Sequence, residues 1–498
     1  MQKTPSRVYR IAGLSLVLAS VACSQPGGEL SAQTDPTAAA EAAATITIED
    51  LQSRIGALAD DSMRGRDTPS PELEKAARHI GRQFREFGLE PIDGDSYLQT
   101  YPLTLTAPGP ASAQTVVIDG PGGGAIPAEA MIAVPGGRLG SVDGPVVVTT
   151  AADRSALGGD VAVLHVTQDG MQAALGAVRG ILDRGAGGLL LSVDAPDFYL
   201  QGLRRFFDRE QLSVGVVDEL LAPVVLVSHA ALPEGLQAAI GSSGSTTGYA
   251  ATVTTSASIR ETLAFNTIGW IEGSDPDLRD EYVVFSAHMD HVGVGEPVDG
   301  DSIYNGADDD ASGTAAVIEL AEAFASMETP PRRSLVFLLV SGEEKGLLGS
   351  EWYAEHPVFP LESTVANLNI DMIGRNWQDT VVAIGRDESS LGETLEDVVA
   401  DRTELGLTMI DDPWPEERFY FRSDHYNFAR NGVPILFFFT GTHADYHGLR
   451  DEPDRILYDK TSRIARLIFY LGLEIADADG RPVWDQAAYR RVVQEGGR

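Results

Sequence analysis

The sequence predicts an α/β protein: a mainly parallel, twisted sheet flanked by helices, with a second, β-rich unit inserted into it. From about residue 264 to 475, apolar β-type runs alternate with helical segments, as in consecutive strand–helix–strand units. From about 120 to 260 the composition shifts to Gly, Ala and Val with closely spaced β-type runs. A length of 498 residues favours two or three domains.

The composition indicates a globular protein, and the net charge argues against nucleic-acid binding. Hydrophobic residues make up 43% and charged residues 22%, which is typical of a globular protein. The chain has 37 basic and 73 acidic residues, a net charge of −36. Because such a surface repels phosphate backbones, we expect no nucleic-acid partner.

The first residues have the pattern of a signal peptide over residues 1–22. Lys3, Arg7 and Arg10 give a positively charged start, and residues 11–22 form an apolar run of suitable length. That run is too short for a transmembrane helix. We therefore expect export.

Cys23 is the only cysteine and follows directly after small residues, as in a bacterial lipoprotein signal. Ser20 stands where such signals usually carry a large aliphatic residue, so plain cleavage and secretion is the alternative. Residues 23–45 are rich in small residues and predict a flexible tether. The expected location is the periplasm or outer membrane, with membrane contact only through a lipid anchor at Cys23. A lone cysteine also excludes a zinc site built from thiolates.

The elements follow in order along the chain. Residues 45–59 open with Thr and acidic residues ahead of an apolar period, which predicts a helix. Residues 71–88 predict a second helix that ends at Gly88. The later strands and helices are expected at EYVVFSAH, residues 312–326, RSLVFLLVS, residues 346–355, VANLNID, residues 389–403, VPILFFFTG and a last helix.

Histidines and carboxylates gather where these strands end. The ligand crevice of an open α/β sheet lies beyond the carboxyl ends of its strands. The candidate residues at these ends are His288, Asp290, His291, Asp308, Asp309, Asp310, Glu343, Glu344, Asp371 and His447. Two imidazoles with three or more carboxylates suit Zn²⁺, and the carboxylate surplus suits two ions that share a ligand.

Each candidate also has an ordinary explanation when it is taken alone. Asp308 to Asp310 suit a helix cap, and Glu343 and Glu344 suit solvated acids in a first helical turn. A single histidine is more often structural than a ligand. The recurrence at successive strand ends favours the metal site for the whole set.

These motifs, in this order and spacing, closely resemble the co-catalytic di-zinc exopeptidases of peptidase family twenty-eight in clan MH, the bacterial leucyl aminopeptidase group. The resemblance covers MRGRDTPSPELEKAARHIGRQFREFGLEP and nearly everything from FNTIGWIEG to DYHGLRDEPDRI. Residues of the inserted region, with GDVAVLHV, DRGAGGLLLSV and APVVLVSHAAL, resemble a protease-associated domain. The implied fold is the zinc exopeptidase fold.

The resemblance implies a domain order. It divides the chain into a signal peptide at 1–22, a tether at 23–45, a discontinuous zinc peptidase domain at 46–119 and 262–480, a protease-associated-like insert at 120–261 and a C-terminal tail at 481–498.

The resemblance also implies roles for individual residues. Asp309 would bridge two Zn²⁺ ions, His288 and Asp371 would complete one site, and Glu344 and His447 the other. Glu343 would be the catalytic general base. The bond between Asp309 and Asp310 is expected to be a non-proline cis peptide.

Further residues are expected around the metals. Asp290 would orient the first histidine, because a ligating imidazole needs its other N–H held. The candidates for binding the oxyanion are Tyr446, Tyr426 and Tyr420. The histidines that match no ligand position, and are expected to have supporting or structural roles, are His291, His425 and His443. Gly448 and Leu449 depart from the Thr-Pro usual after the last ligand.

The function implied is a zinc-dependent aminopeptidase that removes amino-terminal residues from peptide substrates. A metal-bridging water would attack the scissile carbonyl after Glu343 takes its proton. A glutamate-carboxypeptidase-like dipeptidase is the alternative, since Arg375, Arg422 and Arg450 could hold a substrate carboxylate. A glutaminyl-cyclase-like activity and a catalytically silent metal-binding module of the cell envelope are the remaining alternatives.

Overall fold

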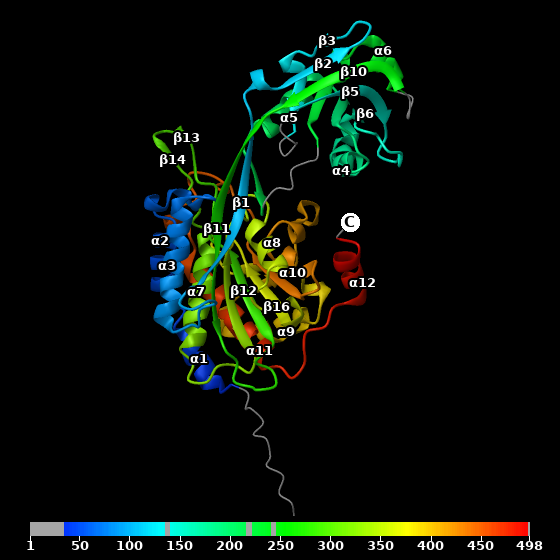
Figure 1. Ribbon diagram of the computed structural model, residues 1–498. Coiled ribbons are helices and arrows are strands. Elements are labelled where there is room, and N and C mark those ends of the chain that lie inside the picture. The colour runs from blue at the N-terminus through cyan, green and yellow to red at the C-terminus, as the bar shows by residue number, and fades with distance from the viewer. Residues whose placement is uncertain (1–33, 135–139, 216–221, 241–245, 497–498) are drawn as a thin grey trace, which may run out of the picture.

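The computed structural model describes residues 34–134, 140–215, 222–240 and 246–496. The expected signal peptide and Cys23 lie outside the described residues. Two sheets organise the molecule, and a long two-stranded ribbon runs from one to the other (Figure 1). Among the described residues, no helix combines the length and apolar character needed to cross a bilayer.

The larger sheet has nine strands and confirms the predicted α/β class. Its order is β18 (Thr408–Ile410), β17 (Thr380–Ile384), β19 (Ile435–Phe439), β16 (Thr364–Ile370), β12 (Tyr282–His288), β15 (Ser334–Val340), β11 (Ala257–Ile271), β1 (Leu98–Pro108) and β8 (Gln211–Val214). Strands β15, β12, β16 and β19 run parallel to one another, while β11, β1 and β8 continue the sheet antiparallel. The parallel centre is where the sequence places its continuous apolar runs, as expected for strands buried on both faces.

Helices cover both faces of this sheet. One face packs against α1 (Pro36–Ala44), α2 (Ile48–Leu58), α3 (Pro71–Phe87), α7 (Ala311–Ala325), α9 (Leu391–Asp401) and α11 (Tyr458–Asp477). The other face packs against α8 (Leu348–Glu355), α10 (His425–Ala429) and residues that follow α12 (Gln486–Tyr489).

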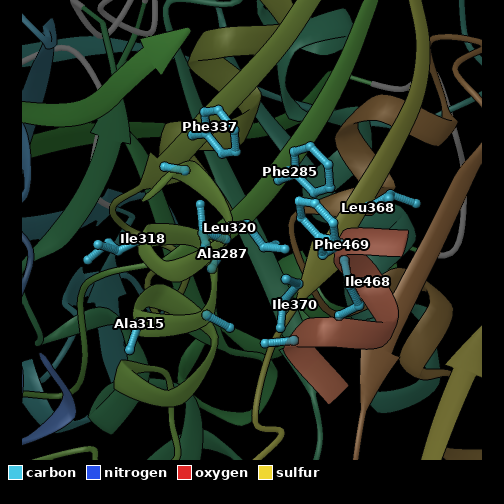
Figure 2. Close-up of a cluster of buried hydrophobic side chains, with 14 of the residues drawn as sticks. Phe285, Ala287, Ala315, Ile318, Leu320, Phe337, Leu368, Ile370, Ile468 and Phe469 are labelled. Carbon is cyan, nitrogen blue, oxygen red and sulfur yellow. The ribbon is translucent and has the colours of Figure 1, made fainter. Parts of the chain in front are cut away.

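Successive residues of the central strands divide between these two cores. Phe285 of β12 and Phe337 of β15 point to the α7 and α11 side, where Figure 2 shows them with Phe469 of α11. Their neighbours Val284 and Val336 point to the opposite core. This is the two-residue alternation of a strand, and it fixes which strand-end side chains face the crevice.

The two helices predicted near the amino terminus are confirmed. Thr47 accepts a hydrogen bond from the Asp50 N–H at the start of α2, and Ser70 does the same for Leu73 at the start of α3. Helix α3 ends at Gly88, whose φ of 85° is the left-handed conformation that glycine adopts most readily. Their buried faces lie against α7 and the sheet.

The expected flexible tether is wrong over its described part. Residues 36–44 form helix α1, which begins at an Asp35 cap with a proline at its first position. Ala39, Ala42 and Ala43 are buried in the core beside α11. Small side chains are common in flexible linkers, but they also allow a helix to pack closely. In this segment the packing against the core stabilises a helix.

The second sheet has eight strands. Its order is β3 (Gly124–Ala125), β2 (Thr115–Asp119), β10 (Thr246–Thr255), β5 (Gly140–Thr149), β6 (Val161–Thr167), β7 (Gly188–Asp194), β9 (Val224–Ser228) and β4 (Met131–Ala133). Helices α4 (Met171–Leu182), α5 (Asp197–Phe207) and α6 (Glu234–Ala239) lie within the same segment. Two details differ from the expected limits of 120–261: β2 already belongs to this sheet, and β8 returns to pair with β1 of the larger one.

Outside the sheets, β13 (Val294–Val298) and β14 (Asp301–Ile303) form a small hairpin. The carboxyl-terminal residues pack against earlier parts of the same chain. Trp484 donates its indole N–H to the Gly432 carbonyl, and Arg491 pairs with Glu388. The expected tail therefore has defined contacts.

Candidate metal centre

The site lies at one edge of the larger sheet. Strands β12, β15, β16 and β19 are parallel neighbours, so the residues that follow them meet at the same edge. Helix α7 begins there as well, with the Asp310 carboxylate accepting the Gly313 N–H at 2.8 Å. Asp310 is thus an ordinary helix cap, and the start of the helix at this point places the neighbouring Asp309 at the strand ends.

One group of ligand atoms forms around His288. Its Nε2 lies 3.3 Å from Asp309 Oδ1 and 3.5 Å from Asp371 Oδ1. All three side chains are almost fully buried. The second Asp371 oxygen accepts the Ser423 hydroxyl at 2.9 Å, which leaves Oδ1 facing the histidine.

A second group forms around His447. Its Nε2 lies 3.1 Å from Asp309 Oδ2 and 3.0 Å from Glu344 Oε2. The two oxygens of Asp309 therefore face different groups. The five residues that the sequence predicts as ligands are brought together by the fold.

The chemistry of these atoms fits a bound cation. Within the described part of the chain, Asp309 Oδ2, Glu344 Oε1 and Asp371 Oδ1 are buried without a hydrogen-bond partner. Buried carboxylates are costly unless they are paired or bind a metal. The imidazole and carboxylate set, with no thiolate, suits zinc. The fold therefore holds a candidate zinc site.

The charges of the cluster shift the pKa values of its members. Burial works to lower the pKa of His288, but the carboxylates of Asp371 and Glu343 outweigh it and raise that pKa well above its usual value. Burial works to raise the pKa of Asp309, but His291 and His288 hold it well below its ordinary range. The cluster thus favours positive charge near these carboxylates.

Glu343, the expected general base, lines the same cavity as His288 and Asp309. Burial raises the pKa of its carboxyl well above the ordinary glutamate value. Its main-chain N–H donates to Asp290 Oδ1 at 3.3 Å. Glu343 therefore places a carboxyl group of raised pKa at a fixed position in the cavity.

Asp290 lies beside the His288 ring with both its main chain and its side chain. The His288 Nδ1 atom lies 3.2 Å from the main-chain carbonyl of Asp290 and 3.7 Å from its carboxylate. The carboxylate also accepts the Thr68 hydroxyl at 3.1 Å and the Glu343 N–H. It ties the β12 loop to the loop that carries Glu343.

The cavity in front of these residues has a volume of about 430 Å³. Its apolar wall consists of Leu347, Met372, Phe419, Phe421, Phe437 and Phe439. Of the three tyrosine candidates, Tyr446 lines this cavity, and burial raises the pKa of its phenol. Tyr420 lines a neighbouring cavity of about 710 Å³, and Tyr426 donates to the Gly496 carbonyl. Of these three tyrosines, Tyr446 is the one that lines the cavity beside the ligand groups.

The other histidines separate by position. His425 is fully buried, and its Nε2 lies 2.9 Å from the Tyr420 carbonyl, which is a structural contact. His443 Nε2 lies 3.2 Å from Asp308 Oδ2. His291 lies within the second group, since its Nδ1 is 2.9 Å from Glu344 Oε1.

Sequence reasoning missed three supporting residues. Asp451 accepts the main-chain N–H groups of Asp308 and Asp309. Arg66 donates to three main-chain carbonyls, those of Met289, Asn305 and Gly306. Asp424 is fully buried near His288, and burial raises its pKa to about 7. Each stands in a polar stretch near a motif, and no spacing distinguishes it from a surface residue.

The bond between Asp309 and Asp310 is a non-proline cis peptide, as expected.

The three arginines considered for a substrate carboxylate differ in position. Arg375 and Arg450 pair with Asp445 at 2.8 and 2.7 Å. Arg422 lines the cavity, is partly exposed and pairs with Glu417 at 3.1 Å.

Known proteins resemble this chain in sequence and fold. Residues 266–472 match the family model described as peptidase family M28. Aminopeptidase YwaD of Bacillus subtilis is 35% identical over 92 residues, which is 18% of this chain and 20% of that protein. Leucine aminopeptidase 1 of Penicillium rubens is 29% identical over 223 residues, covering 41% of this chain and 55% of that one.

A probable glutamate carboxypeptidase of Arthroderma benhamiae is 36% identical over 115 residues, 22% of this chain. The chain spans only 14% of that relative's length. A solved aminopeptidase from Aneurinibacillus sp. strain AM-1 superposes with a TM-score of 0.53 at 19% identity, covering 89% of this chain and 97% of the other. This likeness shows that the two chains share the fold.

Proposed function

This chain carries a peptidase family M28 domain over residues 266–472, and from that premise we propose that it is a zinc-dependent aminopeptidase acting on peptides. The observation that carries the proposal is the convergence of His288, Asp309, Glu344, Asp371 and His447. Their ligand atoms lie 3.0 to 3.5 Å apart at the carboxyl ends of parallel strands.

Two zinc ions are proposed. His288, Asp371 and Asp309 would hold one, and Glu344, His447 and Asp309 the other. Support comes from the two Asp309 oxygens, each of which faces a different histidine. When bound, zinc supplies two effects: it polarises a substrate carbonyl and makes water more acidic.

Glu343 is proposed to move the proton. It lines the cavity, and its raised pKa suits a group that accepts a proton from the attacking water and later gives it to the leaving amine. Tyr446 is proposed to donate a hydrogen bond from its phenolic hydroxyl to the developing oxyanion. Its ring stacks on His447 at 4.0 Å, which holds the hydroxyl beside the ligand group.

The cavity wall indicates where the first substrate residue would lie. Phe437 and Phe439 come from β19, whose end also leads into the His447 loop. An apolar side chain that enters this cavity would leave water and contact these rings. The attached amino group would then lie near the carboxylates of the ligand groups.

A glutamate-carboxypeptidase-like dipeptidase is the second candidate, because Arg422 lines the cavity. It would have to hold a substrate carboxylate with that guanidinium, which would then leave Glu417, while Arg375 and Arg450 are engaged by Asp445. A catalytically silent metal-binding module is the remaining alternative.

One assay separates the three. The purified chain would be given aminoacyl p-nitroanilides, carboxyl-blocked dipeptides and amino-blocked dipeptides, with and without chelator and with zinc added back. We expect cleavage of substrates with a free amino group, loss with chelator and recovery with zinc. Cleavage restricted to amino-blocked substrates would indicate a carboxypeptidase, and zinc binding without turnover a silent module.

We further propose that the protein is exported and anchored through a lipid on Cys23, as a periplasmic or outer-membrane lipoprotein. The motivation is the position of this cysteine directly after the apolar run. Cys23→Ser should abolish membrane association in cell fractionation. Unchanged processing and membrane association of that variant would leave plain signal cleavage, or another anchor, in its place.

A further inference from the structure

His291 has no role among the expected ligands, yet its ring is fully buried inside the second ligand group. Its Nδ1 lies 2.9 Å from Glu344 Oε1 and 3.7 Å from Asp309 Oδ2. Its ring centroid is 5.6 Å from that of His447, which approaches the same two carboxylates. Two imidazoles and two carboxylates therefore surround one point.

The approaches of the His291 ring lack the geometry of a hydrogen bond. Within the described part of the chain, neither ring nitrogen of His291 has a hydrogen-bond partner, and neither has Glu344 Oε1 or Asp309 Oδ2. A buried imidazole without a partner is costly. His291 Nδ1 and Glu344 Oε1 lie 2.9 Å apart without the geometry of a hydrogen bond. Two ligand atoms that bind one cation approach each other in this way.

The spacing agrees with shared coordination. Zinc binds nitrogen and oxygen at roughly 2.0 to 2.2 Å, so the ligand atoms of a tetrahedral site lie about 3.4 Å apart. The four distances from His291 and His447 to Glu344 and Asp309 run from 2.9 to 3.7 Å.

The protein also holds the His291 ring in place. Its main-chain N–H donates to the Arg66 carbonyl at 3.4 Å, and the Arg66 side chain donates to the Gly306 carbonyl at 3.0 Å. Gly306 lies against the ring face, where a Cβ would meet the ring at 2.5 Å. The glycine leaves space for an imidazole at this position.

We infer that His291 is a further metal ligand, binding through Nδ1 at the site of Glu344 and His447. The inference rests on the proposed zinc centre and deepens it. The two sites then differ: one has a single imidazole from His288, and the other has two. The second site should hold its metal more tightly, and a chelator should empty the His288 site first.

The direct test counts imidazoles by X-ray absorption spectroscopy of the full chain loaded with zinc sulfate. With His291 as a ligand, two zinc ions share three imidazoles, an average of about 1.5 nitrogens per zinc, compared with about 1.0 without it. His291→Phe keeps the ring shape without a ligand atom and should lower the average to about 1.0. His425→Phe, a matched change at a buried histidine outside the cluster, should leave it unchanged.

Zinc affinity gives a second readout, measured by competition with a chromophoric chelator. Loss of a residue that only orients a ligand typically weakens metal binding about 10- to 100-fold. His291→Phe should weaken one of the two sites by more than roughly 100-fold and leave the other nearly unchanged.

The outcomes separate this inference from the proposed function. A wild-type protein that binds two zinc ions with an average near 1.0 imidazole would overturn the role of His291 alone, and so would unchanged zinc affinity in His291→Phe. A wild-type protein that binds no zinc would overturn both. The wild-type spectrum decides the question even if His291→Phe fails to fold.

Discussion

The carboxylate of Asp451 accepts the main-chain N–H of Asp309 at 3.1 Å, and the same carboxylate accepts the Asp308 N–H. Asp451 thus binds the backbone of the loop that carries the shared ligand. It is fully buried, and burial raises its pKa to about 6. The segment that follows His447 is therefore hydrogen-bonded to the loop ahead of α7. This contact connects the parts of the chain that carry His447 and Asp309.

Asp451→Asn should weaken zinc binding by about 10- to 100-fold, because the amide turns a donor toward one of these N–H groups. Chelator competition on the purified protein would measure this. Glu452→Gln is the matched control, since the Glu452 carboxylate accepts from the Asn305 side chain. Equal effects of the two changes would contradict a specific role for Asp451.

Glu343→Gln should keep both metals and lose at least roughly 10²- to 10⁴-fold in kcat, because an amide cannot accept the proton of the attacking water. Zinc content by atomic absorption and turnover of an aminoacyl p-nitroanilide would be measured together. Retained activity would show that Glu343 is not the general base.

Glu344→Gln, one position further, should behave differently. It removes a charge from the group that also contains His447, so zinc content itself should fall. Excess zinc should restore part of the activity. If Glu343→Gln and Glu344→Gln lost equal amounts of metal, the assignment of separate roles would be wrong.

His425 should make the protein sensitive to acid. Burial lowers its pKa from 6.5 to about 3, so below pH 6.5 the unfolded chain binds a proton that the folded chain does not. Its contribution to stability is complete above pH 6.5 and is lost as the pH falls toward 3. Between about pH 7.5 and 5.5 the free energy of unfolding should fall by about 1.4 kcal/mol through this residue.

His425→Phe should remove that component of the pH dependence, measured by urea denaturation of the zinc-loaded protein at both pH values. His356 is exposed and stacks on Trp352, so His356→Phe serves as the control and should keep the wild-type dependence. An unchanged pH dependence in His425→Phe would rule out a neutral buried imidazole.

The inserted segment should be removable at a defined place. Pro108 of β1 lies opposite Ala257 of β11 in antiparallel register, so an Asn-Gly turn in place of residues 109–256 would close a hairpin. We expect a soluble protein with wild-type zinc content and altered preference among peptides. A lower melting temperature is expected as well, because β8 and its apolar contacts are lost. Aggregation with loss of zinc would show that the insert is needed for the fold.

The sequence predicts the α/β class and the proximity of the ligands because both depend on local patterns. Apolar runs mark the parallel strands, and strand ends meet at one edge whatever the details of the loops. For this reason the strand pattern alone predicts that Glu343 and Asp371 lie close together. The non-proline cis bond at Asp309 followed from the resemblance alone.

What sequence reasoning could not supply depends on the course of loops. His291 and Asp290 stand next to each other, yet one points into the ligand group and the other toward the Glu343 loop. Tyr420 and Tyr446 were equal candidates until the fold separated them into different cavities. Composition also suggested a tether where Ala42 and Ala43 are buried in the core.

The ribbon of β1 and β11 also bears on the order in which the chain is made. Strand β1 ends at Pro108, and its sheet neighbours β8 and β11 begin at Gln211 and Ala257. On the ribosome, β1 therefore emerges long before either partner. Strands β5, β6 and β7 of the second sheet are joined by short local connections and can pair in the meantime. The insert is thus synthesised, and free to fold, before the catalytic strands that follow it exist.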